Sequence, residues 1–191
     1  MNLPNKLTMF RMCMVPVFLV LLCVPLPMSD TALRIVTAAV FGIVSLTDMI
    51  DGKIARKYNL ITDFGKFMDP LADKFLVISA MLGILVKYDY LRPVFVWAAA
   101  IVIFREFAVT SVRMICANKS GIVIAAAWLG KVKTVTQILA ILVILLEPLI
   151  PLTVCTEYHV LSYVTIAAMT VMTVWSGVDY FRVYGKYIKT V

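Results

Sequence analysis

The chain has 191 residues, of which 62% are hydrophobic and 15% are charged. Soluble globular domains are about 45–50% apolar and about 25% charged, so this composition excludes an ordinary soluble domain and predicts an integral membrane protein. The net charge of +7 includes no run of Lys and Arg of the kind that binds nucleic acid, so no nucleic-acid partner is expected.

Six apolar stretches predict membrane-spanning helices in chain order. They are expected at residues 9–28, 31–56, 66–87, 92–117, 122–147 and 158–183. Helix breakers and polar residues mark their ends, as Pro25 and Pro27 do at the end of the first stretch. At about 20 residues per span, one all-α integral membrane domain of six transmembrane helices fills residues 1–191.

The residues before the first stretch have the composition of a short interfacial helix. Leu3, Leu7 and Phe10 are expected to face the headgroup boundary. Lys6 and Arg11 are expected to face anionic lipid. We therefore predict a separate amphipathic helix that lies on the membrane ahead of the first span.

Charged residues gather at one end of the predicted bundle. If the helices alternate in direction, most Lys and Arg residues fall on one membrane face, and only Arg34, Lys87 and Arg92 lie near the other. The positive-inside rule makes the charged face cytoplasmic. An even number of spans then puts both termini in the cytoplasm. Charges that lie well inside the helices predict a polar cavity on the cytoplasmic side.

Four aspartates stand out in this apolar chain. They are Asp48, Asp51, Asp69 and Asp73. The first two are three residues apart and the last two are four apart, so each pair shares one helix face. A short connection makes the two helices antiparallel neighbours, so the four carboxylates can converge. Each aspartate would cost about 3 kcal/mol at mid-membrane on insertion scales, which requires a compensating partner.

Divalent cations are the partners that this residue set favours. Crowded carboxylates in a low-dielectric space would otherwise tend to protonate. Oxygen ligands without His or Cys favour Mg²⁺, Mn²⁺ or Ca²⁺ over zinc. Two ions about 3.5–4 Å apart would match four carboxylates and suit phosphoryl-type displacement, while one carboxylate can stay free to accept a proton. The alternative is a structural salt-bridge network with Lys53, Arg56 and Lys74.

Residues 48–73 match a known signature at every fixed position. The pattern is D-x2-D-G-x2-A-R-x8-G-x3-D-x3-D. Because it carries this pattern, the chain resembles the CDP-alcohol phosphatidyltransferases, a family of six-helix membrane enzymes of about this length. The resemblance implies that Asp48, Asp51 and Asp69 bind two divalent cations, Mg²⁺ or Mn²⁺. It implies that Asp73 contributes to this metal site and is the catalytic general base. It also implies a pocket for the CDP head group, lined by Gly52, Ala55, Arg56 and Gly65.

Three further segments resemble the bacterial phosphatidylglycerophosphate synthases of that family. They are residues 2–11, 105–113 and 130–134. This resemblance implies a multi-pass enzyme of the bacterial inner or plasma membrane. It would transfer a phosphatidyl group from CDP-diacylglycerol to sn-glycerol 3-phosphate. Homodimers are common in the resembling family, so a homodimer is a further expectation.

A phosphorylated acceptor needs a cluster of cations, whereas a neutral alcohol does not. The cations expected to bind the acceptor phosphate are Arg105, Arg113, Lys131 and Lys133. The alternative for these residues is snorkelling to anionic headgroups, and for Arg105 a local ion pair with Glu106.

Other functions remain open at this point. Within the resembling family, a cardiolipin synthase would use phosphatidylglycerol as acceptor, and a phosphatidylinositol-phosphate synthase would use inositol phosphate. From a different class, a cation channel or carrier would also keep carboxylates inside the membrane. The acids occupy only one half of the predicted bilayer span, which argues against an ion path.

Overall fold

The structure is a computed structural model that describes the backbone of residues 3–57, 63–120 and 128–184. Side chains are described for residues 5–47, 68, 71–114, 128–153 and 155–184. Within these ranges the fold is entirely helical, which confirms the predicted all-α class.

Six long helices make up the described fold. They are α1 (Leu3–Cys23), α2 (Asp30–Lys57), α3 (Asp63–Lys87), α4 (Arg92–Ser120), α5 (Trp128–Leu146) and α7 (Val160–Tyr184). A 3₁₀ turn (Glu147–Leu149) and the short α6 (Thr153–Thr156) connect the last two. Within the described residues, five of the long helices are long and apolar enough to cross a membrane. They are all of the long helices except α3, which carries Asp69 and Asp73 in its first half.

The prediction of a separate interfacial helix at the N-terminus is wrong. Residues 3–11 are the first turns of α1, which continues unbroken to Cys23. The reason is a single stripe of buried residues at three- and four-residue spacing. The stripe stays on one face of the helix from the expected interfacial segment into the expected first span. Its members are Asn5, Thr8, Arg11, Val15, Phe18 and Leu22. Arg11, expected to face lipid, is fully buried in this stripe.

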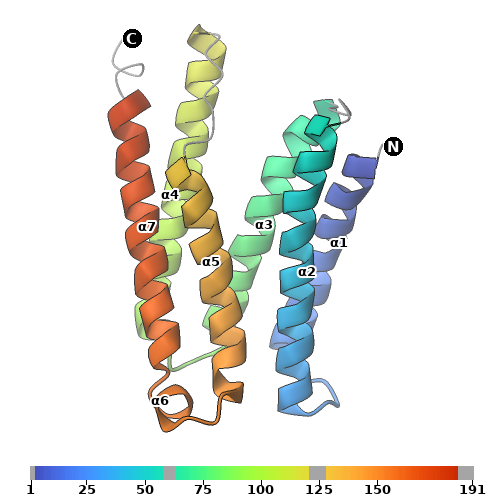
Figure 1. Ribbon diagram of the computed structural model, residues 1–191, viewed down its shortest axis with the longest axis vertical. Helices are drawn as coiled ribbons and strands as arrows, with labels where there is room; N and C mark the ends of the chain where they lie inside the picture. Colours follow the sequence, from blue (N-terminus) through green and yellow to red (C-terminus); the bar gives the residue numbers. More distant parts are fainter. Residues whose placement is uncertain (1–2, 58–62, 121–127, 185–191) are drawn as a thin grey trace.

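The long helices form two groups of three (Figure 1). In one group α1 packs against both α2 and α3, and in the other α7 packs against both α4 and α5. The C-terminal end of α2, the N-terminal end of α3 and the start of α1 lie at one end of the molecule, which we call the aspartate end (Figure 1). The helices α4 and α7 finish at this end too, and α5 starts there.

The apolar core lies away from the aspartate end. Its main cluster takes residues from all six long helices, including Phe18, Phe41, Met81, Phe95 and Ile141. Nearer the aspartate end, the described residues form only a small second cluster between α4 and α7, made of Val109, Val112 and Tyr180. The two helix groups are therefore joined by apolar packing in the core, and nearer the aspartate end a hydrogen bond from Lys74 on α3 to Thr110 on α4 links them.

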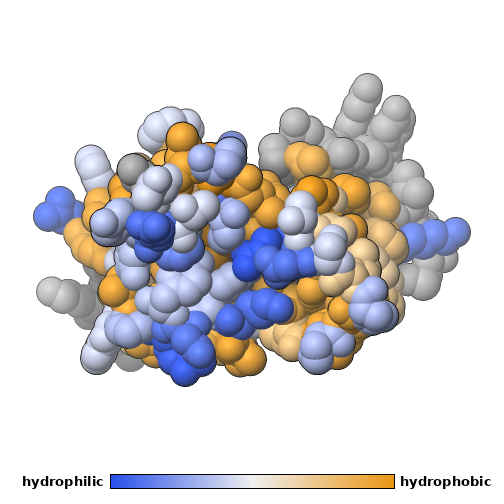
Figure 2. All heavy atoms as spheres, turned by 90° about the horizontal axis from the view of Figure 1, so that it is seen from below, coloured by the Kyte–Doolittle hydropathy of each residue, from blue (hydrophilic) through white to orange (hydrophobic). Residues whose placement is uncertain are grey.

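The opposite end of the bundle is capped by polar contacts. Figure 2 shows hydrophilic residues gathered over this end, bordered by apolar side chains. Asp30 pairs there with Arg34, and Asp89 pairs with Arg92. The buried carboxylate of Glu147 accepts hydrogen bonds from the backbone nitrogens of Leu161 and Ser162, both at 2.8 Å. This satisfies donors in the first turn of α7 and fixes where that helix begins.

Candidate active site

The backbone brings the four aspartate positions to the same end of the molecule. Asp48 and Asp51 lie in the last turns of α2, and Asp69 and Asp73 in the first turns of α3. Asp73 is partly buried, and its side chain interacts with neighbouring groups. The side chains of the other three aspartates lie outside the described residues. The same holds for the expected CDP-pocket residues, which are Gly52, Ala55, Arg56 and Gly65.

Close packing of α1 on α3 fixes the level at which their residues meet. A Cβ atom on Gly83 would lie 2.5 Å from Cδ2 of Leu22, so these two positions are in direct contact. Both helices start at the aspartate end and run in the same direction. Residues that precede Leu22 and Gly83 by the same number of positions therefore lie at the same level along the bundle. Arg11 precedes Leu22 by eleven residues, and Ala72 precedes Gly83 by the same number, which is about 16 Å along each helix. Arg11 is therefore level with Ala72, the neighbour of Asp73.

The buried polar stripe of α1 therefore lies beside the aspartates of α3. Fourteen residues back from the same contact, Thr8 is level with Asp69. Thr8 and Arg11 are fully buried and Asn5 is 7% exposed. The sequence pattern did not reveal these residues because the segment that contains them was expected to form an interfacial helix. Their spacing in phase with Val15 was the signal that could have revealed them.

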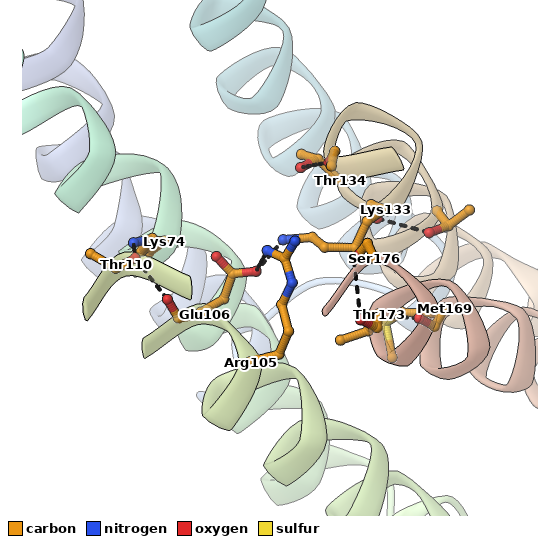
Figure 3. A network of polar contacts seen from close by, with 11 residues as sticks. Lys74, Arg105, Glu106, Thr110, Lys133, Thr134, Met169, Thr173 and Ser176 are labelled. Atoms are coloured by element: carbon orange, nitrogen blue, oxygen red, sulfur yellow. Dashed lines mark hydrogen bonds and ion pairs between the residues drawn. The ribbon is translucent and has the colours of Figure 1, made fainter. Parts of the chain in front are cut away.

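Glu106 joins two of the predicted cations. Its carboxylate accepts a hydrogen bond from Lys133 Nζ on α5 and another from Arg105 Nη1 at 3.2 Å (Figure 3). The side chains are 6% exposed for Lys133 and 13% for both Arg105 and Glu106. A Cβ atom on Gly177 of α7 would lie 3.2 Å from Cγ of Arg105, so this glycine leaves room for the arginine. The network thus links α4 to α5 and packs against α7.

A second polar contact joins this network to the helix of Asp73. Lys74 Nζ donates a hydrogen bond to Thr110 Oγ1, and the Thr110 hydroxyl donates to the Glu106 carbonyl oxygen at 2.7 Å (Figure 3). Asp73 lies close enough to interact electrostatically with both Lys74 and Lys133. An acid on α3 and cations on α4 and α5 therefore share one region.

The other two predicted cations are placed differently. Arg113 is exposed but lies within electrostatic range of Lys74, two turns of α4 beyond Arg105. Lys131 is exposed and only two residues from Lys133, so the two side chains leave α5 on nearly opposite sides. The structure therefore brings Arg105 and Lys133 together and leaves Lys131 apart from them. Glu106, expected only as a local partner of Arg105, is the residue that connects them.

The chain belongs to the CDP-alcohol phosphatidyltransferase family, whose profile matches residues 1–176. The match confirms the resemblance found in the aspartate signature.

Relatives of known name cover nearly the whole chain. A Bacillus subtilis (strain 168) protein named CDP-diacylglycerol–glycerol-3-phosphate 3-phosphatidyltransferase is 40% identical over 201 residues, 99% of this chain and 98% of its own length. An Escherichia coli (strain K12) protein of the same name is 35% identical over 182 residues, 94% of this chain and 92% of its own. A Mycobacterium tuberculosis (strain ATCC 25618 / H37Rv) protein named probable phosphatidylglycerophosphate synthase is 39% identical over 179 residues, 94% of this chain and 79% of its own.

Proposed function

We propose that this protein transfers the phosphatidyl group of CDP-diacylglycerol to sn-glycerol 3-phosphate, which yields phosphatidylglycerophosphate and CMP. The names of relatives that align over nearly the whole chain support this reaction. The structural observation that carries it is the buried pair of cations, Arg105 and Lys133, beside the helix of Asp73. Buried cations of this kind suit an acceptor that carries its own phosphate.

The proposed topology has six membrane spans, with α3 as the sixth. Apart from Lys87 in the last turn, the charged residues of α3 lie in its first half, and its second half contributes Leu76, Ala80 and Ile84 to the main core. The aspartate end faces the cytoplasm of a bacterial cell, because most Lys and Arg residues belong to it. Both termini then lie on that side, around a polar cavity that opens to the cytoplasm. A homodimer is a further part of the proposal, carried over from the resemblance.

The donor set of the aspartate end fits hard divalent cations. Asp48, Asp51, Asp69 and Asp73 offer carboxylate oxygens only, which suits two Mg²⁺ or Mn²⁺ ions. Such ions would neutralise the diphosphate of the lipid substrate and make CMP a better leaving group. The CDP head group would lie against Gly52, Ala55, Arg56 and Gly65, where small side chains leave room and an arginine can reach phosphate or base oxygens.

Different residues then carry out different parts of the reaction. The Asp73 carboxylate accepts the proton of the 1-hydroxyl of sn-glycerol 3-phosphate. The hydroxyl oxygen forms a bond to the lipid-side phosphorus, and the bond from that phosphorus to the oxygen of CMP breaks with the electron pair leaving on CMP. Arg105 and Lys133 hold the acceptor phosphate, with Arg113 and Lys131 nearer the surface. The electrostatic proximity of Lys133 and Asp73 supports this division, because one small acceptor must reach both.

Release of CMP across a panel of acceptors tests the proposal. The purified protein, CDP-diacylglycerol and Mg²⁺ or Mn²⁺ are combined with glycerol 3-phosphate, glycerol, inositol phosphate or phosphatidylglycerol. We expect fast release with glycerol 3-phosphate and little with the others. A preference for phosphatidylglycerol would make the protein a cardiolipin synthase, and a preference for inositol phosphate would make it a phosphatidylinositol-phosphate synthase. Flux of the metal into liposomes without CMP release would point to a carrier.

A further inference from the structure

Gln137 on α5 is buried with an unused hydrogen-bond donor. The residue is 2% exposed, and its Nε2 atom has no hydrogen-bond partner in the described part of the chain. The large majority of buried side-chain polar atoms in proteins are paired, because an unpaired one costs about 1–3 kcal/mol. A donor left unpaired in the absence of substrate is therefore a candidate for contact with a ligand.

The position of Gln137 relates it to the candidate active site. It follows Lys133 by four residues, so the two side chains leave α5 on the same face, about 6 Å apart along the axis. Lys133 reaches Glu106 on α4 and interacts with Asp73 on α3, so this face is directed toward both helices. The next residues on the same face, Ala140 and Ile141, belong to the apolar core. Gln137 thus lies at the boundary between the cation network and the core.

We propose that Gln137 recognises the acceptor by donating a hydrogen bond from its amide to the middle hydroxyl of glycerol 3-phosphate. This inference rests on the proposed function. With the phosphate at Lys133 and Arg105, a three-carbon ester is long enough to place a hydroxyl one helical turn further along α5. The middle hydroxyl takes no part in bond formation, so it is free to serve as a recognition element. A site that is built to bind a hydroxyl rejects an analogue that lacks it, because its own donor is then left unpaired.

Other unpaired buried groups do not compete for this role. The hydroxyls of Ser45 and Tyr180 also lack partners among the described residues. Ser45 lies on α2, and Tyr180 belongs to the small apolar cluster between α4 and α7. Neither shares a helix face with a predicted phosphate-binding cation. Arg105 Nε is also unpaired within the described ranges, but it belongs to a cation already assigned to the phosphate, so Gln137 is a neutral donor beside the cation network that is left for another group of the acceptor.

The experiment compares two acceptors that differ only in this hydroxyl. Steady-state CMP release is measured with glycerol 3-phosphate and with 1,3-propanediol monophosphate, which keeps the phosphate and an attacking hydroxyl. For the wild type we expect kcat/KM to favour glycerol 3-phosphate by about tenfold, the worth of one hydrogen bond. Gln137→Met keeps the length of the side chain and removes its donor. We expect this variant to have kcat/KM values for the two acceptors that differ by no more than about twofold, mainly because kcat/KM for glycerol 3-phosphate falls.

Matched variants separate recognition from folding. Thr136→Val alters the neighbouring residue, whose hydroxyl donates to the Lys133 carbonyl oxygen, and should keep the wild-type preference. Gln137→Leu removes both the donor and the acceptor at similar volume, so it should lose the preference even if Gln137→Met does not fold. A Gln137 variant that is active and keeps the wild-type preference would overturn the inference while leaving the proposed function intact. Absence of CMP release by the wild type with either ester would overturn the proposed function and this inference with it.

Discussion

Glu106 accepts hydrogen bonds from two cations on different helices, and the three side chains are largely buried. Without its charge, Lys133 and Arg105 would face each other uncompensated in a site of low dielectric. Removing one partner from a buried ion pair commonly costs about 3–5 kcal/mol. Glu106 is therefore expected to hold the cations in place before the acceptor arrives.

Replacing Glu106 by Gln tests this role. We expect the midpoint of thermal unfolding in detergent to fall by about 5 °C or more. We also expect KM for glycerol 3-phosphate to rise by about tenfold, because the two cations are no longer held together. Glu157→Gln, at an exposed position near the opposite end, is the control and should behave like the wild type. An unchanged KM in Glu106→Gln would show that these cations do not form the acceptor site.

Asp73 carries the proton transfer in the proposed reaction. Asp73→Asn keeps its shape and removes its basicity, so kcat should fall by about 10²-fold or more while the protein stays folded. Steady-state CMP release and circular dichroism provide the measurements. Asp89→Asn, which removes a carboxylate from the exposed ion pair with Arg92, should retain wild-type turnover. If Asp73→Asn keeps activity within threefold of the wild type, the base lies elsewhere.

Helices α1 and α3 meet so closely at Gly83 that a side chain there would collide with Leu22 and Leu19. This contact sets the depth at which Arg11 and Thr8 stand beside the aspartates of α3. The packing of one glycine in the core thus helps to position polar groups about 16 Å away.

Gly83→Leu should therefore affect both stability and activity. Overpacking of a core commonly costs about 1–3 kcal/mol, and here it would also shift the polar stripe of α1 relative to α3. We expect a lower unfolding midpoint and reduced CMP release. Gly130→Leu is the matched control for stability, because a Cβ atom there meets nothing within 4 Å. Equal unfolding midpoints for the two variants would contradict the proposed role of the contact.

Hydropathy predicted which segments are helices more reliably than where they end. The last helix was expected at 158–183 and runs over Val160–Tyr184. The first was expected to reach residue 28 but ends at Cys23, before Pro25 and Pro27, and it begins earlier than expected because its polar first turns are helical too. Apolar length reports the part of a helix inside the membrane and says little about its polar ends.

Residues on one helix could be grouped from spacing, as Asp69 and Asp73 were. The burial of Arg11 and the joining of Lys133 to Glu106 could not be predicted from spacing alone. Both depend on how each helix is rotated about its axis against its neighbours, and this follows from packing of the whole bundle. The side chains of Asp48, Asp51 and Asp69 lie outside the described residues, so their convergence remains a prediction.

The apolar core and the proposed active site occupy different levels of the molecule. Apolar side chains from all six long helices pack together away from the aspartates. At the aspartate end a hydrogen bond from Lys74 on α3 to Thr110 on α4 links the two helix groups, and Glu106 and Lys133 continue this polar network within the second group. A lipid substrate fits this division, because its acyl chains can stay in the bilayer while its head group enters the polar end.

The central claim is that four carboxylates from α2 and α3 bind two divalent cations at this end. The most direct measurement is a titration of the purified protein with Mn²⁺, followed by electron paramagnetic resonance in the presence of CDP-diacylglycerol. We predict two tightly bound Mn²⁺ ions per chain in the wild type and at most one in Asp69→Asn, with Asp89→Asn unchanged. No tightly bound Mn²⁺ in the wild type, or two in Asp69→Asn, would contradict the account.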